Sequence, residues 1–180
     1  MNNGGIMNKR ERIQTAFLYG VFICYILFLI KILLLSRISH SELRSINLIP
    51  FYSITEYISG NTEDLKRFAF SNVVGNIVIF IPLGAYVFLF KKDKKVITNL
   101  LFIFIVSLFV EIIQGLLGVG ASDIDDIILN CLGGLVGILG YKFLLFILRD
   151  EKKVRVVITL LSAIGLSVLL YLLFMVRLRL

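Results

Sequence analysis

The fold is decided by the stretch VITNLLFIFIVSLFVEIIQGLLG, residues 96–118. This stretch is close in length to the ~20 residues with which a helix crosses the hydrocarbon core of a bilayer. Three polar residues in its second half, Ser107, Glu111 and Gln114, are spaced by four and three residues, so a helix places them on one face. The stretch therefore predicts a membrane-spanning helix with one polar face.

Four further apolar runs of similar length indicate a polytopic membrane protein. They cover residues 15–35, 72–90, 127–148 and 156–176. Among the 180 residues 58% are hydrophobic and 17% are charged, and the mean hydropathy is +0.94. Because a soluble domain has roughly 25% charged residues, this chain is too apolar to be one. We therefore expect an all-α integral membrane helical bundle with about five transmembrane helices.

The runs divide the chain into three parts. Residues 1–14 form a basic N-terminus, residues 15–148 form a core with four of the predicted helices, and residues 149–180 form a short basic loop followed by the fifth helix. Lys and Arg are more frequent in the segments that face the cytoplasm if the N-terminus lies there. The positive-inside rule therefore predicts a multi-pass plasma-membrane protein with a cytoplasmic N-terminus and an external C-terminus.

Charge and cysteine content exclude other classes of protein. The net charge is +7, but the basic residues flank the apolar runs, so the membrane interpretation explains them without a nucleic-acid partner. Cys24 and Cys131 both lie within apolar runs. We therefore expect packing residues there, and neither a disulfide framework nor a zinc site. Membrane lipids are the partners that the composition predicts.

The long segment between the first two runs, residues 36–71, lies outside the membrane in this topology. Its residues 47–52, NLIPFY, expose apolar side chains to water unless they lie in the headgroup zone. Thr62 followed by Glu63 and Asp64 is typical of a helix start, with a capping threonine and acidic residues in the first turn. We therefore expect a partly helical outer loop with one or two short interfacial helices.

Polar residues within the apolar runs are the functional candidates, because a charge in mid-bilayer is costly unless it faces protein or water. At ~1.5 Å per residue, Glu111 lies roughly 10 Å from the outer end of its helix, and Asn76 and Asn130 lie roughly 6 Å from theirs. These similar depths predict one outward-opening polar pocket. The candidate pocket residues are Asn72, Asn76, Glu111, Gln114, Asp123, Asp126, Asn130 and, from the outer loop, Arg44.

Structural interpretations of the same residues remain open. The asparagines are equally consistent with hydrogen bonds that hold the helices together, and Glu111 with a structural ion pair to Arg44. Gly133 and Gly137 are typical of a close helix–helix packing face. Pro82 predicts a kink in the second spanning helix, because proline lacks the amide that would continue the hydrogen-bond pattern.

Four short motifs follow one another along the chain. They are Asn47-Leu-Ile-Pro-Phe51, Asn72-x-x-x-Asn76-x-x-x-Phe80-x-Pro82-Leu-Gly84, Glu111-x-x-Gln114, and Asp123-Ile-Asp-Asp126-x-x-x-Asn130-x-x-Gly133-Gly-x-x-Gly137. Together, and in this order, they resemble the VanZ-like family over roughly residues 37–141. The resemblance implies a small multi-helix membrane protein of the bacterial cell envelope. The founding member of that family is associated with resistance to the glycopeptide teicoplanin.

Three mechanisms are consistent with these residues. The first is a non-enzymatic module, without a cofactor, that binds a lipid, a cell-wall precursor or a lipoglycopeptide at the outer pocket, because the amphipathic outer loop and the polar helix ends suit an amphiphilic ligand. One alternative is an enzyme in which Glu111, Asp123 and Asp126 hold a divalent cation and act on a lipid-linked envelope substrate. Another is a small proton-coupled carrier in which Glu111 titrates. The chain has one histidine and no H-E-x-x-H, G-x-S-x-G or Walker A motif, which favours the non-enzymatic module.

Overall fold

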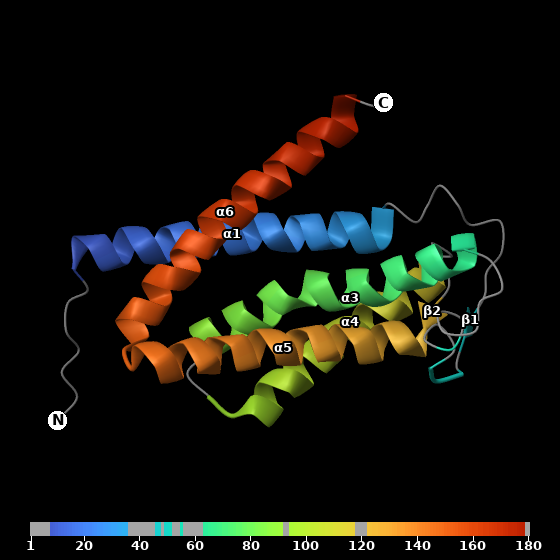
Figure 1. Cartoon of the computed structure of the whole chain (residues 1–180), viewed down its shortest axis with the longest axis horizontal. Coiled ribbons are helices and arrows are strands. Elements are labelled where there is room, and N and C mark those ends of the chain that lie inside the picture. Colours follow the sequence, from blue (N-terminus) through green and yellow to red (C-terminus); the bar gives the residue numbers. More distant parts are fainter. Residues whose placement is uncertain are drawn as a thin grey trace. The chain divides into compact units, whose positions relative to one another are not determined.

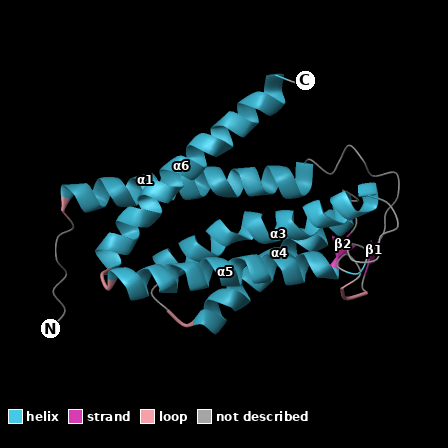
Figure 2. Ribbon diagram, in the orientation of Figure 1, coloured by secondary structure: helices cyan, strands magenta, loops and turns pink. Residues whose placement is uncertain are grey.

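The computed structural model describes residues 8–35, 46–47, 49–51, 55, 63–91, 94–117 and 122–178, most of them in helices (Figures 1 and 2). The helices are α1 (Lys9–Ile30), continued by the π-helical turn η1 (Lys31–Leu35), α3 (Glu63–Phe90), α4 (Val96–Leu117), α5 (Ile124–Leu148) and α6 (Glu151–Leu178). Two two-residue strands, β1 (Ile46–Asn47) and β2 (Ser122–Asp123), form a parallel pair. The predicted all-α fold class is confirmed, and the strand pair is a small local addition to it.

Four of these helices are long and apolar enough to cross a membrane. Their candidate spans are Lys9–Leu33, Ala69–Phe90, Val96–Leu117 and Ile124–Leu148. Each span coincides with one of the first four apolar runs in the sequence. The fifth run, residues 156–176, lies within α6, and its role as a fifth span stays a prediction.

Helix α4 is apolar outside and polar inside. Phe109 and Leu116 are exposed on it, whereas Ser107, Glu111 and Gln114 are buried. The hydrocarbon core of a bilayer suits such an apolar surface, and burial against protein suits the polar residues. The single polar face that was predicted from the spacing of these three residues is therefore confirmed.

The chain comprises two compact units, which are described separately. The first consists of Met1–Phe28 and Leu148–Leu180, and it pairs most of α1 with α6. Leu18 and Val154 are fully buried in this unit. The second consists of Leu29–Ile147, and it contains α3, α4, α5 and the strand pair.

In the second unit, α3 and α5 run in the same direction with their backbones in contact. A Cβ added at Gly133 would lie 2.1 Å from the carbonyl oxygen of Ile77, and one added at Gly137 would lie 2.1 Å from that of Ile81. These distances are far shorter than any van der Waals contact, so only glycine fits at either position. The predicted packing face at Gly133 and Gly137 is therefore confirmed.

Helix α4 packs against α5 in the opposite direction. Positions further along α4 contact positions earlier in α5 and β2, in the pairs Ile103–Gly134, Ser107–Asn130 and Glu111–Asp123. The first residues of α3 and α5 and the last residues of α4 therefore lie at one end of this unit, next to β1 and β2 (Figure 1). The predicted pocket residues on these helices belong to this end.

The outer loop differs in part from its prediction. Helix α3 begins at Glu63, directly after Thr62, as the capping pattern predicts. It then continues without a break into the membrane span, because residues 63–74 contain neither proline nor glycine. These residues are therefore the start of one long helix and not a separate interfacial helix. Arg44 and residues 36–45, 52–54 and 56–62 lie outside the described residues.

Neither cysteine is expected to matter for folding or function. Cys24 is exposed on α1 and Cys131 is half-buried on α5, and both are free thiols. Replacing both by alanine should leave folding, membrane abundance and any cellular phenotype close to those of the wild type. Loss of the phenotype at normal abundance, measured by immunoblotting of isolated membranes, would show that one of the thiols has a role.

Candidate functional site

Asp126 joins the start of α5 to α3. Its Oδ1 accepts hydrogen bonds from Nδ2 of Asn72 at 3.1 Å and from Nδ2 of Asn76 at 2.6 Å. Nδ2 of Asn76 also lies 3.4 Å from Oδ1 of Asn72. The two asparagines are one helical turn apart, so both amides reach the same carboxylate. Asp126 and Asn76 are buried, and the three residues form one polar contact between two helices.

Glu111 joins α4 to the turn that precedes α5. Its Oε2 accepts a hydrogen bond from the backbone N–H of Asp123 at 3.0 Å. Oδ1 of Asp123 in turn accepts a hydrogen bond from the backbone N–H of Asp125 at 3.0 Å, as an N-cap residue does. Glu111 is buried, so this carboxylate contacts the start of α5 away from water.

Asp125 fixes the turn after β1. Its Oδ1 accepts a hydrogen bond from the backbone N–H of Phe51 at 2.5 Å. Phe51 has a φ of 67°, which is rare for a bulky residue. Asp125 is buried, whereas the Phe51 side chain is 54% exposed and Ile49 is exposed beside it in the sequence. The buried carboxylate of Asp125 thus fixes the backbone of this turn by a hydrogen bond, and the side chains of Phe51 and Ile49 are exposed there.

Asn130 on α5 and Gln114 on α4 are two further buried amides of the second unit. Asn130 Nδ2 donates to Ser107 Oγ at 2.9 Å, and Gln114 Nε2 donates to the carbonyl oxygen of Leu33 at 2.7 Å. Both residues have 1% exposure or less. Within the part of the chain that the structure describes, Asn130 Oδ1 and Gln114 Oε1 are buried and accept no hydrogen bond. Each such acceptor costs roughly 1–3 kcal/mol when it is left unsatisfied.

The helices bring together most of the residues that the sequence predicts for the pocket. We call the resulting group the polar cluster: Asn72, Asn76, Ser107, Glu111, Gln114, Asp123, Asp125, Asp126 and Asn130. Arg44, the remaining predicted residue, lies outside the described residues. Ser107 and Asp125 were not predicted as pocket residues. The position of Ser107 on the polar face of α4 is the signal that could have identified it.

The three residues of the metal-dependent alternative take part in hydrogen bonds within the second unit. Among the described residues, no group of three or more histidine, cysteine, aspartate or glutamate side chains is arranged to hold a metal ion. Glu111, Asp123 and Asp126, the residues predicted for such a site, each accept a hydrogen bond from an N–H group of the chain itself. Among these contacts Asp126 links α5 to α3, Glu111 links α4 to β2, and Asp123 caps the start of α5.

Comparison with known proteins identifies the family. Residues 18–149 match the family described as VanZ/LLP1. Protein VanZ of Enterococcus faecium is 32% identical to this chain over 133 residues, which cover 74% of each protein. No solved structure matches the chain. The matched region contains α3, α4, α5 and the whole polar cluster, and the chain therefore belongs to the VanZ-like family of bacterial membrane proteins.

Proposed function

We propose that this chain is a non-enzymatic module of the bacterial plasma membrane that contributes to teicoplanin resistance by binding an amphiphilic envelope ligand at the polar cluster. The ligand class comprises membrane lipids, lipid-linked cell-wall precursors and lipoglycopeptides. Membership of the VanZ-like family supports the link with glycopeptide resistance. The chemistry of the cluster supports binding.

The observation that carries the proposal is the pair of buried carbonyl oxygens on Asn130 and Gln114. Within the described residues neither oxygen accepts a hydrogen bond. Gln114 lies on α4 with the buried carboxylate of Glu111, and Asn130 lies on α5 with that of Asp126. A site so rich in acceptors suits a ligand group that carries N–H or O–H donors, and above all a cationic amine. Such donors occur in the head groups of envelope amphiphiles.

The surroundings of the cluster suit the apolar part of the same ligand. The cluster lies at the end of the unit where α3 and α5 begin, so it is close to one surface of the membrane. Phe51, which Asp125 holds there, exposes its ring, and Ile49 is exposed as well. An amphiphile can therefore place its head group against the acceptors and its hydrocarbon against exposed apolar side chains.

The proposal places this end of the unit on the outer face of the membrane, with the N-terminus of the chain in the cytoplasm. In a variant without Cys24 and Cys131, a membrane-impermeant thiol reagent added from outside is expected to label a cysteine at position 122 and not one at position 93. In the sequence, position 93 precedes the candidate span Val96–Leu117 and position 122 follows it, so a helix that crosses the membrane here places them on opposite sides of it. Labelling at position 93 alone would reverse the orientation and remove the outer site.

The binding step is tested with three probes: teicoplanin, a lipid-linked cell-wall precursor and phosphatidylethanolamine. The purified full chain is incubated with each probe, and the bound amount is measured by native mass spectrometry. Wild-type protein should retain at least one probe. Asn130→Leu, which is similar in size but has no carbonyl acceptor, should bind that probe about five- to tenfold more weakly, as expected for one lost hydrogen bond.

The matched control for this test is Gly140→Ala, a change on the same helix where an added Cβ would meet nothing within 4 Å. This variant should bind the retained probe as the wild type does. Retention of none of the three probes by the wild type, or equal retention by Asn130→Leu, would contradict the proposal.

A further inference from the structure

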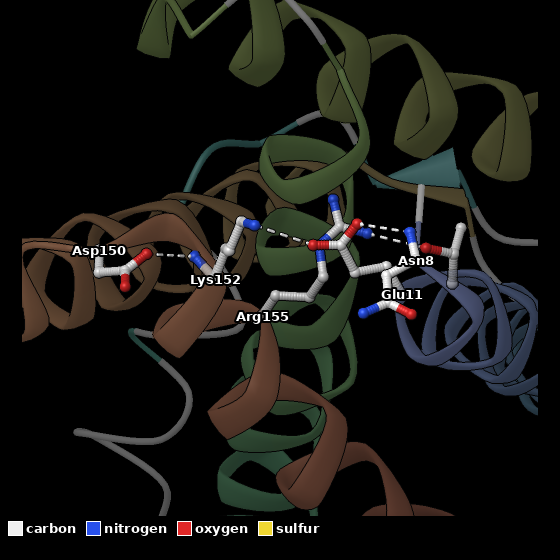
Figure 3. Close-up of polar contacts among 6 residues, drawn as sticks. Asn8, Glu11, Asp150, Lys152 and Arg155 are labelled. Carbon is white, nitrogen blue, oxygen red and sulfur yellow. Dashed lines mark hydrogen bonds and ion pairs between the residues drawn. The ribbon is translucent and has the colours of Figure 1, made fainter. Parts of the chain in front are cut away.

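The first turns of α1 and α6 lie side by side. An ion pair joins Glu11 Oε1 to Lys152 Nζ at 2.9 Å, and Arg155 Nη1 donates a hydrogen bond to Thr15 Oγ1 at 3.1 Å. Gln14, the neighbour of Thr15, donates through Nε2 to Thr159 Oγ1 at 2.9 Å. Both hydrogen bonds join positions further along α1 and α6 than Glu11 and Lys152, so the two helices begin at the same end of this unit. Figure 3 shows the contacts of Glu11 with Lys152 and with the backbone N–H of Asn8 at this junction.

This junction collects basic side chains from two distant parts of the sequence. We call it the basic end. Its exposed members are Lys9, Arg10, Arg12, Arg149, Lys152 and Lys153, and Arg155 is half-buried beside them. The acidic residues here are Glu11, Asp150 and Glu151, so the cations are in clear excess.

Two of the three acidic residues at the basic end form contacts within the two helices. Glu11 is paired with Lys152, and this hydrogen bond raises the pKa of Lys152, which therefore stays cationic. Asp150 Oδ1 accepts the backbone N–H of Lys152 at 2.8 Å and so caps α6. Two helix N-termini also contribute partial positive charge at the same place. The basic end is therefore a preorganised site for an anion.

The position of the basic end relative to the membrane identifies that anion. The candidate span of α1 begins at Lys9 itself, and exposed Ile13 follows within about 6 Å along the helix axis. On α6, Val156 and Leu160 are exposed within about two turns of Lys153. Cations that lie so close to exposed apolar side chains sit at the depth of phospholipid head groups.

We infer that the basic end binds the phosphate of an anionic phospholipid head group, with the acyl chains of that lipid lying against the exposed apolar residues of α1 and α6. Phosphate accepts hydrogen bonds from lysine and arginine in this geometry. An acidic protein segment offers the charge but no partner for Ile13, Val156 and Leu160, so the lipid is the better match. The inference is independent of the function proposed for the polar cluster.

The test compares retention of phosphatidylglycerol and phosphatidylcholine by the purified full chain in detergent, again by native mass spectrometry. Wild-type protein should prefer phosphatidylglycerol. The triple variant Arg10→Gln, Arg12→Gln, Lys153→Gln should lose at least about tenfold of this preference, because each cation near an anionic surface contributes about fivefold to binding. Purification before the measurement separates lipid binding from effects of charge on membrane insertion.

The matched control removes the same charge elsewhere, with Lys66→Gln, Arg67→Gln and Lys142→Gln in the second unit. It should keep the preference of the wild type. Equal losses in both triple variants would show that the preference depends only on net charge. An unchanged preference in the first triple variant would show that the basic end does not select the anionic lipid. Either result would overturn the inference.

A single variant gives a test of opposite sign. Glu11→Gln removes a negative charge and releases Lys152 from its ion pair, so it should strengthen retention of phosphatidylglycerol about fivefold. If the junction only held α1 and α6 together, loss of the ion pair would leave retention unchanged or weaken it. Such a result would also overturn the inference.

Discussion

Gly133→Ala is expected to disrupt the packing of α3 against α5 and to lower the free energy of unfolding by about 3 kcal/mol or more. The added Cβ would lie 2.1 Å from the carbonyl oxygen of Ile77. That neighbour is helix backbone, so no side-chain rotation can relieve the overlap, and the two helices must separate. Because the polar cluster is built from side chains of both helices, separation would also remove the contact of Asp126 with Asn72 and Asn76.

Each helix supplies its own control for this prediction. A Cβ added at Gly84 on α3 would lie 2.0 Å from the carbonyl oxygen of Gly134 on α5. A Cβ added at Gly75 on α3 or at Gly140 on α5 would have no atom within 4 Å. Alanine at Gly84 should therefore be as damaging as at Gly133, and alanine at Gly75 or Gly140 should be harmless. Unfolding by denaturing detergent, followed by circular dichroism, measures all four. Equal stability across the set would refute the close packing.

Periodicity in the sequence was sufficient to predict much of the polar cluster. Ser107, Glu111 and Gln114 share a face of α4 because steps of three and four residues follow the helical turn, and the structure buries all three. Asn72 and Asn76 are one turn apart for the same reason, and both reach Asp126. Local spacing thus predicted which side chains point inward.

The rest of the site depends on contacts between distant parts of the chain. Ile46 pairs with Ser122 and Asn47 with Asp123, and no local pattern predicts a two-residue pairing across that separation. Asp125 was not predicted as a pocket residue, because its hydrogen-bond partner Phe51 lies 74 positions earlier in the sequence. Residues that act through such long-range hydrogen bonds can be recognised only from the three-dimensional structure.

Glu111→Gln is expected to abolish function while the protein still inserts, folds and purifies at wild-type levels. Glutamine keeps the size of the side chain and an oxygen that can accept the N–H of Asp123, which lies 3.0 Å from Glu111 Oε2. At this contact the substitution therefore removes the charge and keeps an acceptor. If the carboxylate serves only to join α4 to the turn before α5, glutamine should replace it well, because neutralising a buried charge lowers its cost of burial.

The double variant with Asp126→Asn tests whether the cluster works as a unit. Asp126 accepts hydrogen bonds from Asn72 and Asn76 on α3. Glu111 accepts one from the backbone N–H of Asp123 before α5, so these contacts give the two carboxylates different partners. Groups that act on one ligand are non-additive, and the second substitution should then add little to the loss caused by the first. Independent, additive losses at both positions would indicate two separate structural contacts.

Growth of a sensitised bacterial host under teicoplanin, normalised to the membrane abundance of the protein, tests the central claim most directly. Wild-type chain and the control Glu151→Gln, which neutralises an exposed acid on α6, should raise the tolerated concentration above that of cells without the protein. Cells with Glu111→Gln at equal abundance should tolerate no more teicoplanin than cells without the protein. Full protection by Glu111→Gln, or none by the wild type, would contradict the assignment of a teicoplanin-protective binding site to the polar cluster.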